Sequence, residues 1–350
     1  MNKELSVNGR KQFSAMQEAM QKTYNVADAS KHFAVDPTVE QRLQDAITDS
    51  VAFWSGINVV AVDDIKSQKV LGVANGIIGK RTDTDAGDRQ TTDVMSLGEQ
   101  NYELFFTESD THIRYITIDA WSKFPDFKKR YGKWVRTQIA LGRMKVGWHG
   151  VAAAAVTDLV ANPNGEDVNR GWIQALRDYN GGSQMFDEGA TVGEIQIGAG
   201  GDFENLDAAV HGAIQMLHPN YQSSDDLVAI VGRELLATEK SQLYTNQAPT
   251  PTEKERIENS AVVATYGGLP TPRPPSNFPA RGLIVTSLDN LSYYYQSGSV
   301  RRAVTDNPKR NRIEDYQSTN DGYIVEDELK AAAFEFANVR VRNAAADAWI

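Results

Sequence analysis

The sequence predicts an α+β protein, and three observations lead to this prediction. Residues 123–148 show a long amphipathic helical pattern. Residues 63–118 hold apolar, strand-like runs on either side of a polar segment. Residues 196–290 alternate between helical and strand-like segments, the order typical of a compact α/β module. With 350 residues, the chain has room for about two domains that each bury a core.

The helical pattern at residues 123–148 is the strongest single signal. Its apolar residues recur at spacings of three, four and seven, as on one helix face: Phe127, Tyr131, Trp134, Leu141, Met144 and Trp148. The opposite side is basic, with Lys128, Lys129, Arg130, Lys133, Arg136, Arg143 and Lys145. Such a basic side is either solvated or faces a polyanion, and the residues alone leave both interpretations open.

Composition excludes several classes of protein. The net charge of −10 argues against a protein that coats nucleic acid with its whole surface, although one local basic face remains compatible with it. Cysteine is absent, which excludes disulfides and Cys-based metal sites or nucleophiles. No apolar run approaches the roughly 20 residues of a membrane span, and the first residues lack a signal-peptide core. No membrane partner is therefore expected.

The N-terminal third begins with two helical patterns. Residues 1–33 carry a narrow apolar stripe that needs a partner, so this segment is either an ordinary docked helix or a detachable arm. Asp36 and Pro37 are suited to cap and start a second helix. Beyond it, residues 70–78 and 102–118 frame the polar segment 80–93, which predicts a long two-stranded excursion with a strand at Ile113–Ile118. Because a lone ribbon is only marginally stable, it should lie on another surface.

The C-terminal half combines the α/β module with further strands. Gly198–Gly201 leads into Asp202, which is expected to cap a helix at residues 203–217. A buried strand is predicted at residues 226–231, and a further strand at residues 283–286. Ser292–Val304 predicts a strand pair around a Ser-Gly turn, and residues 311–324 read only as polar with scattered aromatic side chains.

A search for catalytic or metal-binding motifs gives little. The sequence has no GxxxxGK[ST] loop, no HExxH and no GxSxG elbow, and its five histidines lack metal-ligand spacing. Gly198–Gly201 before a helix is the best anion-binding candidate, for a nucleotide-dependent enzyme, but a glycine-rich turn explains it better. No catalytic residue, metal or cofactor is assigned.

Several blocks along the chain together resemble the major capsid proteins of Peduovirus-type tailed phages. Among them are RYITIDAWSKFPDF at residues 114–127, DDLVAIVGRELLA at residues 225–237 and NDGYIVED at residues 320–327. The resemblance extends from about Ala27 to Val341. It implies the Hong Kong 97 capsid fold, with an N-arm, an extended β loop, a peripheral domain built on a long spine helix, and an axial α/β domain.

The resemblance also implies how the chain is divided. The implied segments are a scaffold-like N-terminus removed on maturation (1–33), the N-arm (34–60), the extended loop (61–108), the peripheral domain with the spine helix (109–195), the axial domain (196–290), strands returning to the peripheral domain (291–342) and a flexible tail (343–350). Processing is expected near Phe33 and Ala34. The basic helix face would contact packaged DNA weakly through Lys128, Lys129, Lys133 and Arg136.

In function, the resemblance implies a structural protein and not an enzyme. Copies would self-assemble as hexamers and pentamers into the icosahedral head of a virion, around double-stranded DNA. Assembly would take place in the host cytoplasm, with a scaffolding protein, a prohead protease and a portal protein as partners. An encapsulin-like nanocompartment shell, which uses the same fold, is the alternative.

Overall fold

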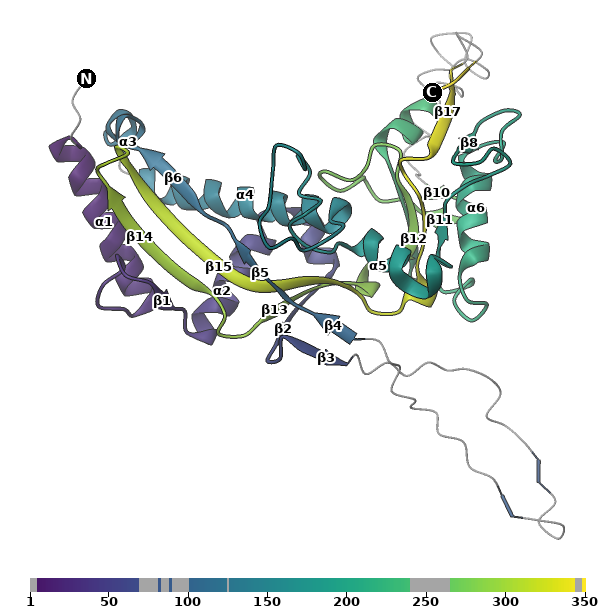
Figure 1. Cartoon of the computed structure of the whole chain (residues 1–350), viewed down its shortest axis with the longest axis horizontal. Helices are drawn as coiled ribbons and strands as arrows, with labels where there is room; N and C mark the ends of the chain where they lie inside the picture. The colour runs from purple at the N-terminus through teal and green to yellow at the C-terminus, as the bar shows by residue number, and fades with distance from the viewer. Residues whose placement is uncertain are drawn as a thin grey trace.

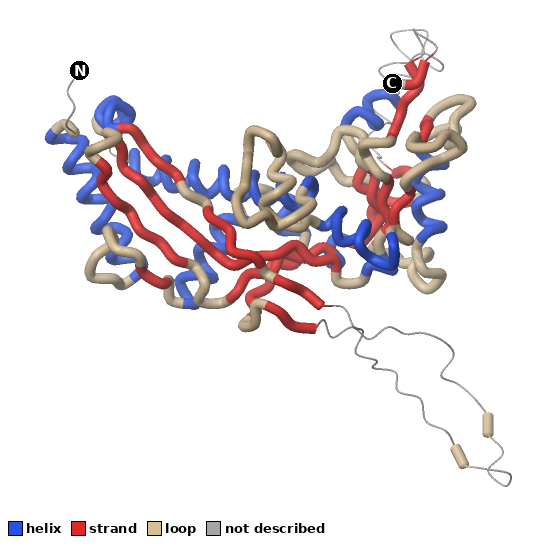
Figure 2. The backbone as a smooth tube through the Cα atoms, in the orientation of Figure 1, coloured by secondary structure: helices blue, strands red, loops and turns tan. Residues whose placement is uncertain are grey.

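In the computed structural model, the chain forms two modules that stand next to each other, with helix α1 and strand β17 at opposite ends (Figure 1). The structure describes residues 5–68, 81–82, 88–89, 101–124, 126–239, 265–343 and 348–350. The first module combines one large sheet with several helices, and the second contains smaller sheets around helix α6 (Figure 2). The predicted α+β class is confirmed.

The large sheet has seven strands and is centred on β15 (Arg312–Val325). Strands β14 (Arg301–Asn307) and β13 (Leu291–Gln296) follow each other along one edge of β15, and both are antiparallel to it. Strands β6 (Thr111–Arg114) and β5 (Phe105–Glu108) occupy the other edge. The two strands and the Ser-Gly turn predicted at residues 292–304 are present, but the strands do not form a hairpin. They lie end to end, because both pair with β15 and not with each other.

Two short strands extend this sheet, and helices cover it. Strand β1 (Phe33–Ala34) pairs with β14, and β2 (Asn58–Val62) runs parallel to β13. Helices α2 (Pro37–Thr48), α4 (Phe127–His149) and α5 (Trp172–Asp178) enclose the main core with the sheet. This core is rich in aromatic side chains, among them Trp54, Trp148, Trp172, Tyr293, Tyr295 and Tyr323.

A second apolar cluster lies at the outer end of the first module. Helix α1 (Val7–Tyr24) buries Phe13, Met20 and Tyr24 there, as its stripe predicted. Helix α3 (Tyr115–Trp121) adds Tyr115 and Ile118. The strand predicted over Ile113–Ile118 thus ends at Arg114 and continues as a helix. Asp36 caps α2 as expected, accepting a hydrogen bond from the Thr38 amide at 2.9 Å.

The second module is built on a four-stranded sheet in the order β7-β16-β12-β9. Its strands are β7 (Met185–Phe186), β16 (Ala332–Phe334), β12 (Leu283–Ser287) and β9 (Leu227–Val231). Both faces of this sheet are buried. Alternate residues enter different cores: Ile230, Ile284 and Ala333 join the main core, whereas Ala229, Val231, Leu283, Val285, Ala332 and Phe334 join the core around α6.

The rest of the second module surrounds α6 (Leu206–Met216). A three-stranded sheet combines β8 (Ile195–Ile197), β17 (Val339–Asn343) and β18 (Ala348–Trp349), and a small sheet pairs β10 (Thr265–Tyr266) with β11 (Leu269–Pro270). Residues 233–239 are helical. Short 3-10 helices complete the chain at Ala52–Gly56, Tyr179–Gly181, Leu288–Asn290 and Glu328–Lys330.

Three sequence-based expectations differ from this arrangement. The local pattern of residues 311–324 is polar and gave no strand signal, yet this stretch supplies most of β15, the centre of the large sheet. Strands β16 and β17, expected in the peripheral domain, pair with β12 and β8 of the second module. In the tail that was expected to be flexible, Ala348 and Trp349 pair with Asn343 and Arg342.

The base of the excursion is a two-stranded sheet of β3 (Lys66–Gln68) and β4 (Asn101–Glu103). The apolar run expected at residues 70–78 lies outside the described residues, as does most of the polar segment 80–93. The base leaves the large sheet next to β2 and β5 (Figure 1).

Candidate functional site

Helix α4 is the element on which the first module is assembled. It begins at Phe127, later than predicted, and buries Phe127, Val135, Ile139, Ala140, Arg143, Met144, Gly147 and Trp148. Trp134 was expected in this stripe, but it is 57% exposed. Val135 takes its place toward the core, because adjacent helix positions point about 100° apart.

The basic residues of α4 do not form one open face. Lys129 and Lys133 are exposed. Lys128 is half-buried, and its Nζ donates a hydrogen bond to the Ala15 carbonyl of α1 at 3.4 Å. Arg136 is half-buried beside Met16 and Met20, where it lines a concavity between α1 and α4. Helix α1 therefore covers part of the surface that was expected to contact DNA.

Arg143 was placed on the basic side, and this prediction is wrong. Its side chain is buried, donates a 2.7 Å hydrogen bond to Gln44 Oε1 and stacks over the Tyr293 ring at 4.8 Å. Next to it lies the buried carboxylate of Asp321, on β15. Burial raises the pKa of Asp321, whereas the Arg143 charge and hydrogen bonds from Thr107 and Tyr293 favour the ionised form.

Asp321 connects elements that are far apart in the sequence. It accepts hydrogen bonds from Thr107 Oγ1 of β5 at 2.7 Å, from Tyr293 Oη of β13 at 2.7 Å and from Asn169 Nδ2 at 3.1 Å. Because buried carboxylates are costly unless they are hydrogen-bonded, this site holds the strands in one register. The local sequence did not predict this buried site, because its only signal is an acidic residue in an otherwise polar stretch.

The expected processing site lies in regular structure. Phe33 and Ala34 form β1, opposite Arg302 and Arg301 of β14. The Arg302 side chain is nearly buried, pairs with Asp315 at 2.9 Å and donates to Tyr24 Oη at 2.7 Å. The preceding loop is attached as well, since Val304 N donates to the Ala29 carbonyl at 2.9 Å. The N-terminal segment is thus docked and not free.

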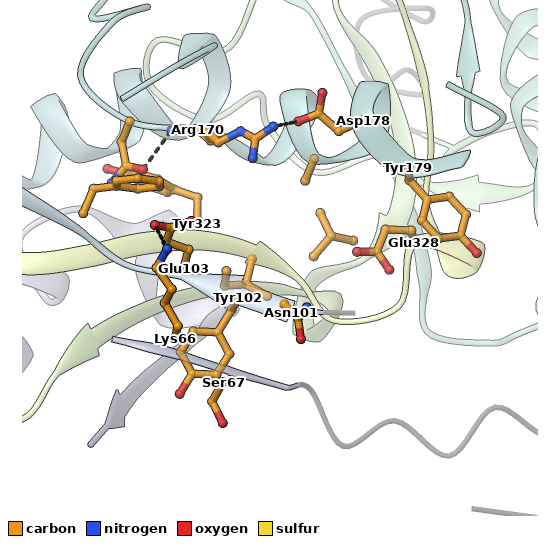
Figure 3. Close-up of a pocket in the computed structure, with 16 residues that line it drawn as sticks. Lys66, Ser67, Asn101, Tyr102, Glu103, Arg170, Asp178, Tyr179, Tyr323 and Glu328 are labelled. Carbon is orange, nitrogen blue, oxygen red and sulfur yellow. Dashed lines mark hydrogen bonds and ion pairs between the residues drawn. The ribbon is translucent and has the colours of Figure 1, made fainter. Parts of the chain in front are cut away.

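A concavity of about 620 Å³ lies between the base of the excursion and α5 (Figure 3). Ion pairs stand on its two sides: Lys66 with Glu103 on the excursion, and Arg170 with Asp178 near α5, each at 2.5 Å. The base is held to the sheet by a small apolar cluster of Tyr102, Leu104 and Ile324. The pairing within the base and this small cluster suit a projecting arm better than a catalytic pocket.

The glycine run of the second module does not form an anion site. Gly198 N donates to the Phe203 carbonyl at 2.8 Å, and Gly201 N donates to the Gly198 carbonyl at 2.9 Å. These amides are used inside the loop, so they are not directed at a ligand. Asp202 was predicted to cap helix α6, but the residue that caps this helix is Asn205. Asp202 instead accepts from the amides of Ala190 and Gln196 at 2.7 and 2.8 Å.

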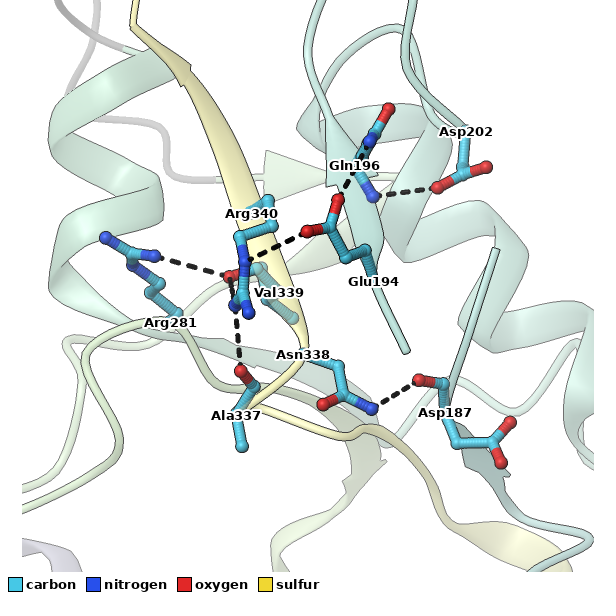
Figure 4. A network of polar contacts seen from close by, with 9 residues as sticks. All are labelled: Asp187, Glu194, Gln196, Asp202, Arg281, Ala337, Asn338, Val339 and Arg340. Atoms are coloured by element: carbon cyan, nitrogen blue, oxygen red, sulfur yellow. Dashed lines mark hydrogen bonds and ion pairs between the residues drawn. The ribbon is translucent and has the colours of Figure 1, made fainter. Parts of the chain in front are cut away.

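Polar contacts fasten β17 to the second module (Figure 4). Arg340 Nη1 donates to the Ala337 carbonyl at 2.8 Å, and its Nε lies 3.7 Å from Glu194 Oε1. Asn338 Nδ2 donates to the Asp187 carbonyl at 2.7 Å. Arg281 bridges the Val339 carbonyl and Glu234. The charged side chains of Arg340, Glu194, Arg281 and Glu234 all have partners within the module, so these contacts hold β17 in place.

Within the part of the chain that the structure describes, no group of three His, Asp or Glu side chains is placed to hold a metal ion. In the same residues, no helix is both long and apolar enough to cross a membrane.

Comparison with known proteins identifies the family. Residues 12–337 match the model of the phage major capsid protein, P2 family. The chain belongs to this family. It is 36% identical over 312 residues to the capsid protein of Escherichia phage P2, covering 87% of this chain and 86% of that protein. It is 30% identical over 321 residues to the major capsid protein of Serratia phage KSP20, covering 90% and 92%.

A solved capsid structure agrees with this assignment. A chain of the satellite phage P4 procapsid, solved with its size determination protein, is 33% identical and superimposes with a TM-score of 0.77, covering 96% of this chain and 99% of that chain. The protein is therefore a phage major capsid protein with the capsid fold, a structural component of the virion and not an enzyme. The encapsulin and nucleotide-enzyme alternatives are set aside.

Proposed function

We propose that copies of this chain form the hexamers and pentamers of an icosahedral head that encloses double-stranded DNA. Assembly takes place in the host cytoplasm on a scaffolding protein, and a portal protein occupies one vertex. The observation that carries the proposal is the match to a chain of the satellite phage P4 procapsid, which covers 96% of this chain. Two-module shape and a projecting two-stranded base support it, because a shell subunit needs lateral contacts with several neighbours.

Co-expression with the phage's scaffolding protein tests this proposal. Negative-stain microscopy should show closed particles of uniform size with the scaffold, and irregular shells or aggregates without it. Many weak contacts reinforce one another in such a shell, so assembly should depend steeply on protein concentration. A chain that stays monomeric at high concentration with the scaffold present would contradict the proposal.

We further propose that a prohead protease removes the N-terminal segment near Phe33 and Ala34. Protease active sites bind extended chain, whereas β1 is paired with β14 and α1 is packed on the cluster around Ile118. The segment must therefore detach before it is cut. Intact-mass spectrometry of mature particles should show chains that begin near Ala34, and chains that retain Met1 would refute the step.

We also propose that the basic side of α4 contacts packaged DNA, through Lys129 and Lys133 while α1 is docked, and through Lys128 and Arg136 as well once α1 has been removed. Lys129 and Lys133 are exposed, whereas Lys128 and Arg136 are engaged with α1 as long as it is docked. We expect Lys129→Glu with Lys133→Glu to lower retention of packaged DNA, increasingly at high salt, while shells still assemble. If shell assembly fails first, these lysines belong to an interface between subunits.

A further inference from the structure

Two exposed apolar surfaces of opposite charge remain without a partner on this chain. The first, called the aromatic groove, lies between β6, α3 and α4 and has a volume of about 640 Å³. Ile113, Phe127 and Tyr131 line it, with Trp121 and Trp134 at 43% and 57% exposure. Large exposed apolar side chains gathered in one groove are typical of a binding surface.

The charge of the aromatic groove is basic. Its charged lining residues are Arg114 and Arg130, and no Asp or Glu of the described chain lines it. Arg130 forms an exposed ion pair with Asp126 at 2.7 Å, which is weak in water and open to competition. Arg130 also lies 5.9 Å from the centre of the Phe124 ring, and the Trp121 ring is tilted against the same ring with the two centres 5.7 Å apart. The rim is thus ordered before any partner binds.

The second surface is the loop at residues 151–167, between α4 and α5. Three of its apolar side chains, Val156, Leu159 and Val160, are almost entirely in solvent, at 87%, 64% and 93% exposure. The loop contains Asp158, Glu166 and Asp167 and no Lys or Arg. It is called the acidic loop below.

The acidic loop is a fixed structure. Ala154 N donates to the Asp167 carbonyl at 2.9 Å, and Lys145 Nζ donates to the Pro163 carbonyl at 2.6 Å. Asp158 accepts from the amides of Val160 and Ala161 at 2.9 and 3.2 Å, which holds the apolar tip outward. A preorganised loop loses little conformational entropy when it binds.

The two surfaces of one chain cannot meet. The groove lies beside the start of α4 and the loop follows its end, and a helix of this length spans about 30 Å. The hydrogen bonds at both sides of the loop prevent it from folding back. Each copy therefore offers one half of a contact that only another copy can complete.

We infer that the acidic loop of one copy inserts its Val156–Val160 tip into the aromatic groove of a neighbouring copy. Such a contact is heterologous, joining two different surfaces, and it propagates from copy to copy as a shell requires. Arg114 and Arg130 face the negative loop, while Trp134 provides the large aromatic anchor typical of interface hot spots. The inference rests on the proposed shell assembly and specifies one of its contacts.

The absence of cysteine allows a direct test by cross-linking. Thr117→Cys, in the groove, and Val160→Cys, in the loop, are combined in one full-length chain and co-expressed with the scaffolding protein. Oxidation of the assembled shells should give a ladder of covalent oligomers on denaturing gels. The matched control pairs Thr117→Cys with Val192→Cys, because Val192 is an equally exposed apolar residue in the second module at 84%. The control should give no ladder.

A second measurement tests how much this contact contributes to the free energy of assembly. Trp134→Ala and Leu159→Ala should each raise the concentration needed for assembly at least ten-fold, and the double variant should be little worse than either, because both remove one contact. The control is Phe106→Ala, because Phe106 is an aromatic residue outside both surfaces and is 61% exposed. This variant should change the concentration needed for assembly less than two-fold. Thermal unfolding of the free subunit checks that each variant folds.

The outcomes separate the inference from the proposed function. Normal shells without a ladder, or additive effects of Trp134→Ala and Leu159→Ala, overturn the inference while shell assembly stands. The inference is also overturned if Trp134→Ala abolishes binding of the scaffold or of DNA while Leu159→Ala has no effect on assembly. The aromatic groove would then bind that partner. If even the unmodified chain forms no shell, the proposed function itself fails.

Discussion

At the scale of single residues, the core of the first module depends on close approach between α4 and α5. Gly147 faces the Trp172 ring, and a Cβ added at Gly147 would lie 2.5 Å from Trp172 Cζ3. Trp172 is fully buried, and its Nε1 donates to the Ser292 carbonyl at 2.9 Å. The glycine is therefore required by packing and not by backbone conformation.

Gly147→Ala should lower the free energy of unfolding by about 1–3 kcal/mol, because the buried Trp172 ring has no free space into which to move. Gly142 is the matched control on the same helix, since a Cβ there meets nothing within 4 Å. Gly142→Ala should be neutral or stabilise by up to about 1 kcal/mol through helix propensity. Urea unfolding of the free subunit measures both, and equal effects would contradict this account.

Asp321 makes stability depend on pH. Burial raises its pKa above the unfolded value of 3.8, so the folded state binds this proton more tightly than the unfolded chain. The resulting stabilisation is complete below 3.8 and is lost as pH rises through the folded-state pKa.

The difference in unfolding free energy between the wild type and Asp321→Asn should therefore shift in favour of the wild type as pH is lowered from neutral toward 3.8. Urea unfolding of both proteins at several pH values gives this difference. The contributions of the other titrating groups are common to both proteins and cancel in it. A shift in the opposite direction would show that the Arg143 charge outweighs burial.

At the scale of elements, α1 packs on an apolar cluster that other elements complete. Phe13, Met20 and Tyr24 bury themselves against Ile118, Val304 and Ile313 of other elements. Only the eight-residue loop 25–32 connects α1 to β1. A docked helix on a short connection can leave as a unit, which is what a trimming step needs.

Phe13→Ala should loosen α1 by about 3–5 kcal/mol, because a buried aromatic side chain is lost from the cluster. Val7→Ala, on the same helix but 87% exposed, should have almost no effect. Trypsin digestion followed by mass spectrometry would report the rate at which the first 31 residues are released. Equal rates for the two variants would mean that α1 is not held by this stripe.

At the scale of the whole molecule, one sheet joins the two modules. Because alternate residues of β9, β12 and β16 enter different cores, neither core is complete without this sheet. The two modules should therefore unfold together, although chains of this size often unfold in steps.

Leu227→Ala, in the core around α6, should cost about 2–5 kcal/mol and shift the whole transition. Tryptophan fluorescence mainly reports the first module, which contains Trp54, Trp148 and Trp172, and far-UV circular dichroism reports both. The two curves should shift together. A fluorescence transition that stays in place while the dichroism transition shifts would show independent modules.

The sequence by itself determined the elements whose signals are local. The stripe of α1, the Asp36 cap of α2 and the existence of helices α4 and α6 follow from spacing and capping, which depend on neighbours within about two helical turns. The apolar runs of β9 and β12 likewise indicated strands, although their burial on both faces appears only in the structure. The order of the sequence blocks that resemble the family was enough to point to capsid proteins.

Only the tertiary structure decided where polar groups are buried. β15 is polar in sequence, yet it is the central strand, because Thr107, Asn169 and Tyr293 satisfy Asp321 from distant parts of the chain. Arg143 is buried and not on the basic face for a similar reason, since its guanidinium donates a hydrogen bond to Gln44 and lies over the Tyr293 ring. Polar residues of this kind are buried when partners distant in the sequence supply their hydrogen bonds. No local sequence pattern contains that information.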